Sequence, residues 1–136
     1  MMERRYLPTL AELIDRLSIL QLKEVFIPEN KTAYSQEIKD IMYDIDLICK
    51  GDCSIDRLFL NADVIRSIIV LAQMNLHIWH NESEARNGGD GNLKLTHGLN
   101  GIRNDAKNRI AKHNGERVDL KTDCLAAEFK DWEISW

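Results

Sequence analysis

Residues 62–79 read ADVIRSIIVLAQMNLHIW, and this stretch decides the fold of the chain. Its apolar residues recur at alternating intervals of three and four positions, the spacing of the seam along which one helix packs on another in a coiled coil. The residues at this spacing are Leu58, Ala62, Ile65, Ile69, Ala72, Leu76 and Trp79. Three more, Ile68, Val70 and Leu71, widen the apolar face beyond what one neighbouring helix covers. The stretch therefore predicts a long helix with several neighbours, which is typical of an all-α bundle.

Three other helices accompany this one in the sequence. Thr9 and Glu12 form a capping box, which satisfies unpaired amides in the first turn of a helix, and Pro28 stops that helix near Phe26. The glycine-rich run of residues 87–92 separates the long helix from a last one. We expect the four main helices over residues 9–26, 32–50, from between 54 and 61 to 86, and 93–113.

The length of 136 residues fits a single domain, 1–136, with a core large enough to need no disulfide or metal. The tail, residues 116–136, contains two tryptophans, Trp132 and Trp136, which a solvated tail seldom carries. We expect this tail to dock on the bundle or on a neighbouring subunit. Because the long helix is apolar on more than one side, we also expect the protein to be a homo-oligomer.

Charge, hydropathy and cysteine content exclude several classes of protein. The net charge of −4 opposes the basic field that binds a nucleic-acid backbone, so we expect no nucleic-acid partner. No apolar run approaches the roughly 18 residues of a membrane span, so we expect no membrane partner. Three cysteines, an odd number without a signal-peptide core ahead of them, favour a cytoplasmic protein over a secreted disulfide framework.

Polar side chains follow three of the predicted helices at helical spacing, so that each set lies on one helix face. The first set is Glu12, Arg16 and Lys23, with Asp15 beside them. The second set is Asn75, Trp79, Glu82 and Arg86. The third set is Asn100, Arg103 and Lys107, with Asn104 beside them. If the three faces converge, they enclose a polar pocket, and otherwise each is an ordinary solvated helix surface.

The residue types in these sets suit a small phosphorylated ligand. Arginine and lysine bind phosphate oxygens, the first through paired donors and the second as a mobile point charge. Trp79 has a ring that can stack on a base or sugar, while asparagine side chains both donate and accept hydrogen bonds. We therefore expect non-catalytic binding or sequestration of a nucleotide or sugar nucleotide, with no separate cofactor.

Two alternative functions stay open. A metal-dependent nucleotide hydrolase would hold magnesium through carboxylates such as Glu12 with Asp15 and Glu82 with Glu84, although the E-x-x-E and E-x-x-D pattern of all-α pyrophosphohydrolases is missing. An oligomeric scaffold or adaptor would instead use the long helix and the tail to bind another protein.

A histidine cluster raises the question of a metal site. His77, His80 and Glu84 are spaced so that they share a helix face, and imidazole and carboxylate are suitable ligands for zinc or iron. No specific metal motif surrounds them, and a further ligand would have to come from another helix. We therefore assign no metal site to the sequence and keep these residues as candidates.

Three segments resemble those of a family of small helical proteins of unknown function from bacteria and phages. Residues 12–23, ELIDRLSILQLK, are similar to its ELxD[RK][LI][ST]IxxLK segment, and residues 78–86, IWHNESEAR, to its [LI]WxxExxxR segment. Residues 100–109 are similar to a third, basic piece. The resemblance implies a helical fold and a bacterial or phage origin, but no reaction. It points to Glu12, Asp15, Arg16, Lys23, Trp79, Glu82 and Arg86.

Overall fold

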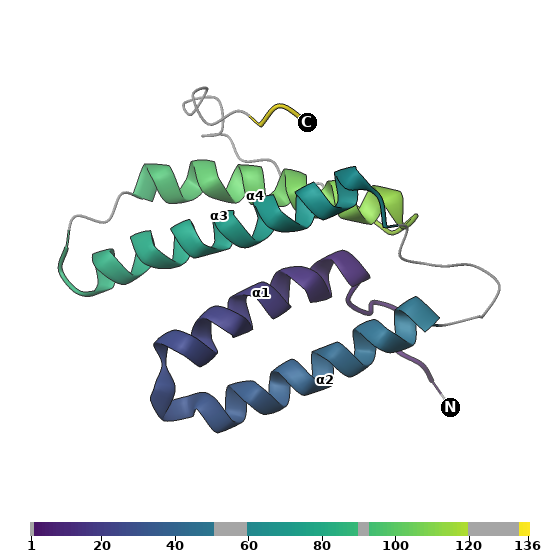
Figure 1. Cartoon of the computed structure of the whole chain (residues 1–136), viewed down its shortest axis with the longest axis horizontal. Coiled ribbons are helices and arrows are strands. Elements are labelled where there is room, and N and C mark those ends of the chain that lie inside the picture. The colour runs from purple at the N-terminus through teal and green to yellow at the C-terminus, as the bar shows by residue number, and fades with distance from the viewer. Residues whose placement is uncertain (1, 51–59, 90–92, 120–133) are drawn as a thin grey trace.

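A computed structural model of the chain describes residues 2–50, 60–89, 93–119 and 134–136. These residues form four α-helices and contain no strand, which confirms the predicted all-α bundle (Figure 1). The helices are α1 (Leu10–Phe26), α2 (Lys31–Lys50), α3 (Ala62–Arg86) and α4 (Leu93–His113), with a short 3-10 helix, Pro28–Asn30, between α1 and α2. None of the helices in these ranges is long and apolar enough to cross a membrane.

The helix ends follow from local sequence chemistry. The Thr9 hydroxyl accepts a hydrogen bond from the backbone amide of Glu12 at 3.1 Å, which confirms the predicted cap of α1. Asn61 does the same for α3, where its side chain accepts from the amide of Val64 at 2.9 Å. This cap explains why α3 begins at Ala62, while residues 54–59 of the predicted range lie outside the described residues.

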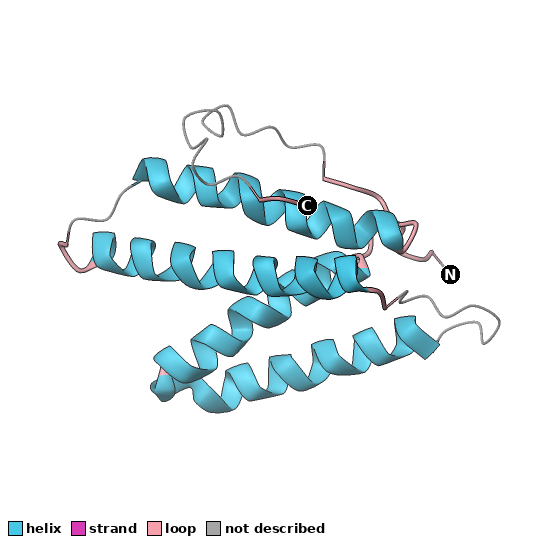
Figure 2. Ribbon diagram, turned by 45° about the horizontal axis from the view of Figure 1, so that its top comes forward, coloured by secondary structure: helices cyan, strands magenta, loops and turns pink. Residues whose placement is uncertain are grey.

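The four helices form two hairpins that α1 holds together. α3 and α4 run side by side along most of their length, and α1 crosses both of them at an angle (Figure 2). α2 packs on α1 and on the short 3-10 helix, but within the described residues it contacts neither α3 nor α4. α1 is therefore the element through which α2 is attached to the rest of the bundle.

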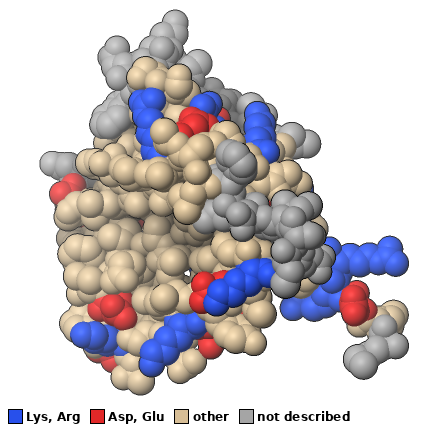
Figure 3. Space-filling model, turned by 45° about the vertical axis from the view of Figure 1, so that its right-hand side comes forward, with Lys and Arg blue, Asp and Glu red and all other residues tan. Residues whose placement is uncertain are grey.

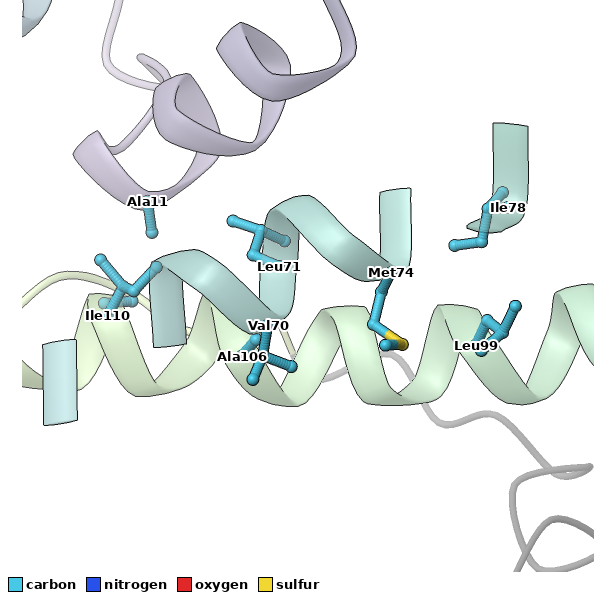
Figure 4. Packing of buried hydrophobic residues seen from close by; sticks show 9 residues of the cluster. Ala11, Val70, Leu71, Met74, Ile78, Leu99, Ala106 and Ile110 are labelled. Carbon is cyan, nitrogen blue, oxygen red and sulfur yellow. The ribbon is translucent and has the colours of Figure 1, made fainter. Parts of the chain in front are cut away.

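Two apolar cores match these two sets of contacts. The larger core lies between α1, α3 and α4 (Figure 4), and its buried members are Ala11, Val70, Leu71, Met74, Ile78, Leu99, Ala106, Ile110 and Ala111. The smaller core joins Leu13 and Leu20 of α1 to Ile41 of α2. Complete burial of a leucine stabilises a fold by about 1.5–3 kcal/mol. Because α2 buries only one side chain, its contact with α1 is weaker than the contact of α1 with α3 and α4.

The last residues of the tail, 134–136, contact the bundle. Ile134 packs against the larger core, and the guanidinium groups of Arg66 and Arg109 lie 5.5 and 4.4 Å from the centre of the Trp136 ring. Arg66 also donates a hydrogen bond to the carbonyl oxygen of Ser135 at 2.6 Å. Residues 120–133, which include Trp132, lie outside the described ranges.

The N-terminus of α1 is buried and takes its hydrogen-bond acceptor from the segment after α4. Leu10 and Ala11 are 1% and 0% exposed, so water cannot satisfy their amides. The Glu116 carboxylate accepts from both, at 2.6 Å from the Leu10 nitrogen and 3.2 Å from the Ala11 nitrogen. A carboxylate at this position also opposes the positive end of the helix dipole. Glu116 thereby ties the start of the bundle to its end.

Replacing Glu116 by alanine should lower the free energy of unfolding by about 1–2 kcal/mol, because two buried amides lose their acceptor and a helix loses its cap. Urea unfolding followed by circular dichroism measures this change. Glu29→Ala is the matched control, since Glu29 is exposed in the 3-10 helix. Equal stability of the two variants would show that Glu116 does not contribute as a cap.

The first turn of α3 is tied to the last turn of α4 by one carboxylate. Asp63 accepts hydrogen bonds from Arg109 at 2.7 Å and from His113 at 2.6 Å. The bond from Arg109, followed by that from His113, holds the pKa of Asp63 below its ordinary value of 3.8. Since the folded state favours the charged carboxylate, this contribution to stability is present above the ordinary pKa and is lost as pH falls through the lowered one.

The Asp63→Asn variant should therefore be less stable than the wild type at neutral pH. The difference in stability should start to narrow as the pH drops below 3.8, where this carboxylate becomes protonated in the unfolded wild-type chain, and it should be lost below the lowered pKa of the folded state. Chemical unfolding of both proteins from about pH 7 to about pH 3 measures the difference. Asp105→Asn serves as control, because Asp105 is exposed and has no ion pair with any residue in the described ranges. A gap between Asp63→Asn and wild type that does not change with pH would contradict this account.

Candidate functional site

The polar face of α1 borders a cleft of about 410 Å³, termed here the α1 cleft. Its lining residues are Pro8, Glu12, Leu13, Asp15, Arg16, Ile19, Leu20, Lys23 and Lys107. A second hollow of about 350 Å³ adjoins it and shares Glu12 and Lys107. The α1 cleft thus contains all four polar residues predicted on the first helix and one of those predicted on the fourth.

Three cations from two helices line the α1 cleft. Arg16 and Lys23 lie two turns apart on α1, and Lys107 reaches the cleft from α4. Arg16 is 4.0 Å from Glu37 with a side chain 69% exposed, so this ion pair is weak and leaves the guanidinium accessible. The Lys23 ammonium lies 5.9 Å from the centre of the Tyr34 ring. The Lys107 side chain is only 12% exposed, and its nitrogen is 3.5 Å from Asp119.

The two carboxylates of the α1 cleft are already hydrogen-bonded. Glu12 accepts from Arg117 at 3.0 Å and from the Thr9 hydroxyl at 3.2 Å. Asp15 accepts from Asn75 at 2.8 Å. Each of the two carboxylates is therefore stabilised by hydrogen bonds from groups on α3 or on the segments that flank α1 and α4. The three cations have longer contacts and face the cleft with less compensation.

Asn75 joins α3 to α1 in the interior. Its side chain is 3% exposed and its amide nitrogen donates to Asp15 at 2.8 Å and to the Ser18 hydroxyl at 2.6 Å. Ser18 in turn donates to the backbone oxygen of Asp15 at 2.8 Å. The position of Asp15 in the cleft therefore depends on a buried asparagine of a different helix. Of the second predicted set, Asn75 is the residue that the structure brings to the first set.

The other members of the second set lie further along α3. The Trp79 ring stacks on Phe26, with ring centres 6.5 Å apart and an angle of 27°, beyond the Lys23 end of the α1 cleft. Glu82 and Arg86 form an exposed ion pair at 3.2 Å, one helical turn apart. Such pairs contribute little to stability. Trp79 thus contacts α1 at Phe26, after Lys23, and does not line the cleft, while Glu82 and Arg86 lie on the outer surface of α3.

On α4, Lys107 is the member of the third set that lines the cleft. Asn104 is buried and Asn100 is half-buried, and neither lines it. Arg103 is half-buried, and its Nε has no hydrogen-bond partner among the described residues. The three predicted sets therefore meet through Asn75 and Lys107, and their remaining members spread over the two helices.

Residues that the spacing argument did not select complete the neighbouring hollow. Arg117 stacks on the Tyr6 ring at 3.9 Å and donates to the backbone oxygen of Leu7 at 2.5 Å, while Asp119 pairs with Lys107. These residues lie before α1 and after α4, in segments without helical periodicity. Only the fold brings them together, so the sequence carried no signal for them.

The candidate metal ligands are all on the outside of α3. His77, His80 and Glu84 are exposed, and in the described ranges no three histidine, cysteine, aspartate or glutamate side chains come together as a metal site would require. His80 instead lies with its ring centre 6.5 Å from that of Phe26. Among the described residues, this cluster on one helix thus lacks the further ligand that a bundle site needs.

Comparison with known proteins identified no relative of this chain. No protein-family model, no curated protein and no solved structure matches the chain. The resemblance of residues 12–23, 78–86 and 100–109 to a family of unknown function stays a prediction from those three segments.

Replacing Asn75 by alanine should lower the free energy of unfolding by about 2–3 kcal/mol, because the Asp15 carboxylate and the Ser18 hydroxyl lose a buried donor. Gln73→Ala, an exposed position on the same helix, should change it by less than about 0.5 kcal/mol. Urea unfolding at neutral pH gives both values. If Asn75→Ala is as stable as Gln73→Ala, the buried link between α1 and α3 does not contribute to the free energy of unfolding.

Proposed function

We propose that the protein binds a small phosphorylated ligand, a nucleotide or sugar nucleotide, in the α1 cleft without transforming it. The observation that carries the proposal is the convergence of three cations, Arg16, Lys23 and Lys107, from two helices on one cleft of about 410 Å³. Guanidinium and ammonium groups are the side chains that bind phosphate oxygens most strongly. A volume of several hundred Å³ is typical of small-molecule sites.

The accessible charge of the cleft favours the binding of a negatively charged ligand. Glu12 and Asp15 are engaged by Arg117 and Asn75, so their negative charges are partly compensated. Lys107 is almost buried, and its ion-pair partner Asp119 is at 3.5 Å, so an incoming phosphate could approach its ammonium more closely. A partly desolvated ammonium interacts with an anion more strongly than one in water does.

The positions of the aromatic residues favour a nucleotide over a simple phosphate. Phe26 lies ten positions after Arg16 on α1, about 15 Å along the helix axis. Its ring and that of Trp79 form an apolar platform beyond the Lys23 end of the cleft. A ligand with its phosphates between Arg16 and Lys107 would extend its base or sugar towards this platform, where stacking adds binding energy.

Binding without catalysis agrees better with the carboxylates than hydrolysis does. A magnesium-dependent hydrolase needs several carboxylate oxygens directed at the cation and the substrate phosphates. In this cleft the Glu12 carboxylate accepts from the hydroxyl of the cap residue Thr9 and from Arg117, and Asp15 is bound by Asn75. Both carboxylates thus have positioning roles within the fold, which leaves the cations to meet the ligand.

Replacing Lys107 by methionine should weaken binding of ADP by at least about tenfold, since the apolar stem stays packed while the ammonium is lost. Isothermal titration calorimetry with ADP, UDP-glucose and pyrophosphate measures the affinities of wild type and variant. A greater loss for ADP than for pyrophosphate on Trp79→Ala would support stacking at the platform.

The control for this experiment is Lys39→Met, which removes an exposed lysine of α2 that does not line the cleft. It should bind all three compounds as the wild type does. Wild-type protein that binds none of them, or Lys107→Met with unchanged affinities, would disprove binding in the α1 cleft. Release of inorganic phosphate by wild type with magnesium would favour the hydrolase instead.

A further inference from the structure

α3 leaves one of its apolar faces outside the core. Ile65, Ile69 and Leu76 are 48%, 51% and 37% exposed, although the adjacent face of the same helix is buried. Ala62 and Ala72 continue this stripe and are also exposed. The set Ala62, Ile65, Ile69, Ala72, Leu76 and Trp79 is termed here the α3 seam, and Trp79 at its end is half-buried. A continuous apolar stripe of this length on the surface marks an interaction site.

The α3 seam borders an open groove. Because α2 makes no contact with α3 among the described residues, an edge of α1 is left uncovered between them. On α1, Val25 lies on the edge opposite Arg16, and on α2, Met42 lies on the edge away from Glu37, the partner of Arg16. Val25 and Met42 are 62% and 53% exposed. The groove is thus apolar and lies on the other side of α1 from the α1 cleft.

A space-filling view shows the character of this face. Across its middle it carries a broad expanse without visible Lys, Arg, Asp or Glu, hollowed near its centre (Figure 3). Charged side chains gather along its upper and lower edges (Figure 3). An uncharged centre with a charged rim is the composition of a protein–protein interface, and it offers nothing to a phosphate or a nucleic acid.

We propose that the α3 seam packs against the α3 seam of a second copy of the chain, antiparallel, in a two-fold symmetric homodimer. The order of residue sizes along the seam carries this inference. With the two-fold axis between positions 69 and 72, Ile69 lies opposite Ala72 of the second copy and Ile65 lies opposite its Leu76. Ala62 lies opposite Trp79 of the second copy. Each alanine therefore faces a larger residue, so that every facing pair fills the space between the two helices.

Other arrangements of the seam fit less well. A parallel pair would set every residue opposite its own copy, so that Ala62 and Ala72 would face alanine and leave voids, while Trp79 would meet Trp79. An unrelated helix would cover one seam, whereas a two-fold contact covers both seams at once. The pairing extends over 18 residues, 62–79, about 27 Å of helix. It would also bring Val25 and Met42 against the helix of the second copy.

Sedimentation of the full chain tests the dimer at micromolar concentration. Wild type should sediment as a dimer, and Ile69→Asp should raise the dissociation constant at least about a hundredfold, because a carboxylate would be buried against an apolar partner. Leu47→Asp is the matched control, since Leu47 is an aliphatic residue 54% exposed on the outer face of α2, away from the groove. Helical circular dichroism unchanged from wild type shows that each variant is folded, and Ile69→Lys repeats the test with the opposite charge.

A mixing experiment tests the antiparallel register. Ile69→Asp and Ala72→Lys should each be monomeric alone, and the two together should form a heterodimer, because positions 69 and 72 face each other and the new charges pair. Native mass spectrometry distinguishes the species. Monomeric wild type, dissociation by Leu47→Asp but not by Ile69→Asp, or a mixture that stays monomeric would each overturn the proposal. The dimer does not rest on ligand binding in the α1 cleft. The two proposals share Trp79, so the variants used here leave Trp79 unchanged and test the dimer separately.

Discussion

The rest of the structure depends on how the buried start of α1 is satisfied. A helix leaves its first amides without partners, and those of Leu10 and Ala11 are closed off from water. Thr9 supplies one acceptor from the same turn, and Glu116 supplies two more from more than 100 positions away. Because a buried amide without an acceptor costs about 1–3 kcal/mol, α1 can be central only if the segment after α4 returns to it. The same return brings Arg117 to Glu12.

Once α1 is fixed in this position, its two edges acquire different chemistry. One edge holds Arg16 and Lys23, and with Lys107 it borders the α1 cleft. The other edge holds Val25 and continues into the apolar α3 seam. The buried link from Asn75 to Asp15 sets α1 on α3 between these two edges. The fold therefore separates the polar surface at which we propose that a small anion binds from the apolar surface at which we propose that a second copy packs.

Local signals in the sequence predicted the helices well. Thr9, Pro28 and the glycine-rich run after α3 act within a few residues, so their effect can be read without knowing the fold. The candidate site was harder, because helical spacing places residues on one face but does not say which faces meet. Lys107 and Asn75 joined the first set, whereas Glu82 and Arg86 paired with each other on the surface. Arg117 and Tyr6 lie outside any helix, and periodicity could not select them.

The α3 seam shows why periodicity alone underdetermines packing. Two apolar faces run along α3, and both have helical spacing. The face with Leu71 and Met74 is buried against α1 and α4, while the face with Ile65 and Ile69, which has the more regular coiled-coil spacing, is exposed. A bundle in which α2, over the described residues, contacts only α1 and the short 3-10 helix has too few neighbours to cover both faces. The spacing in residues 62–79 thus predicted correctly that α3 needs several neighbours, and the described residues of this chain supply a cover for only the first of its two apolar faces.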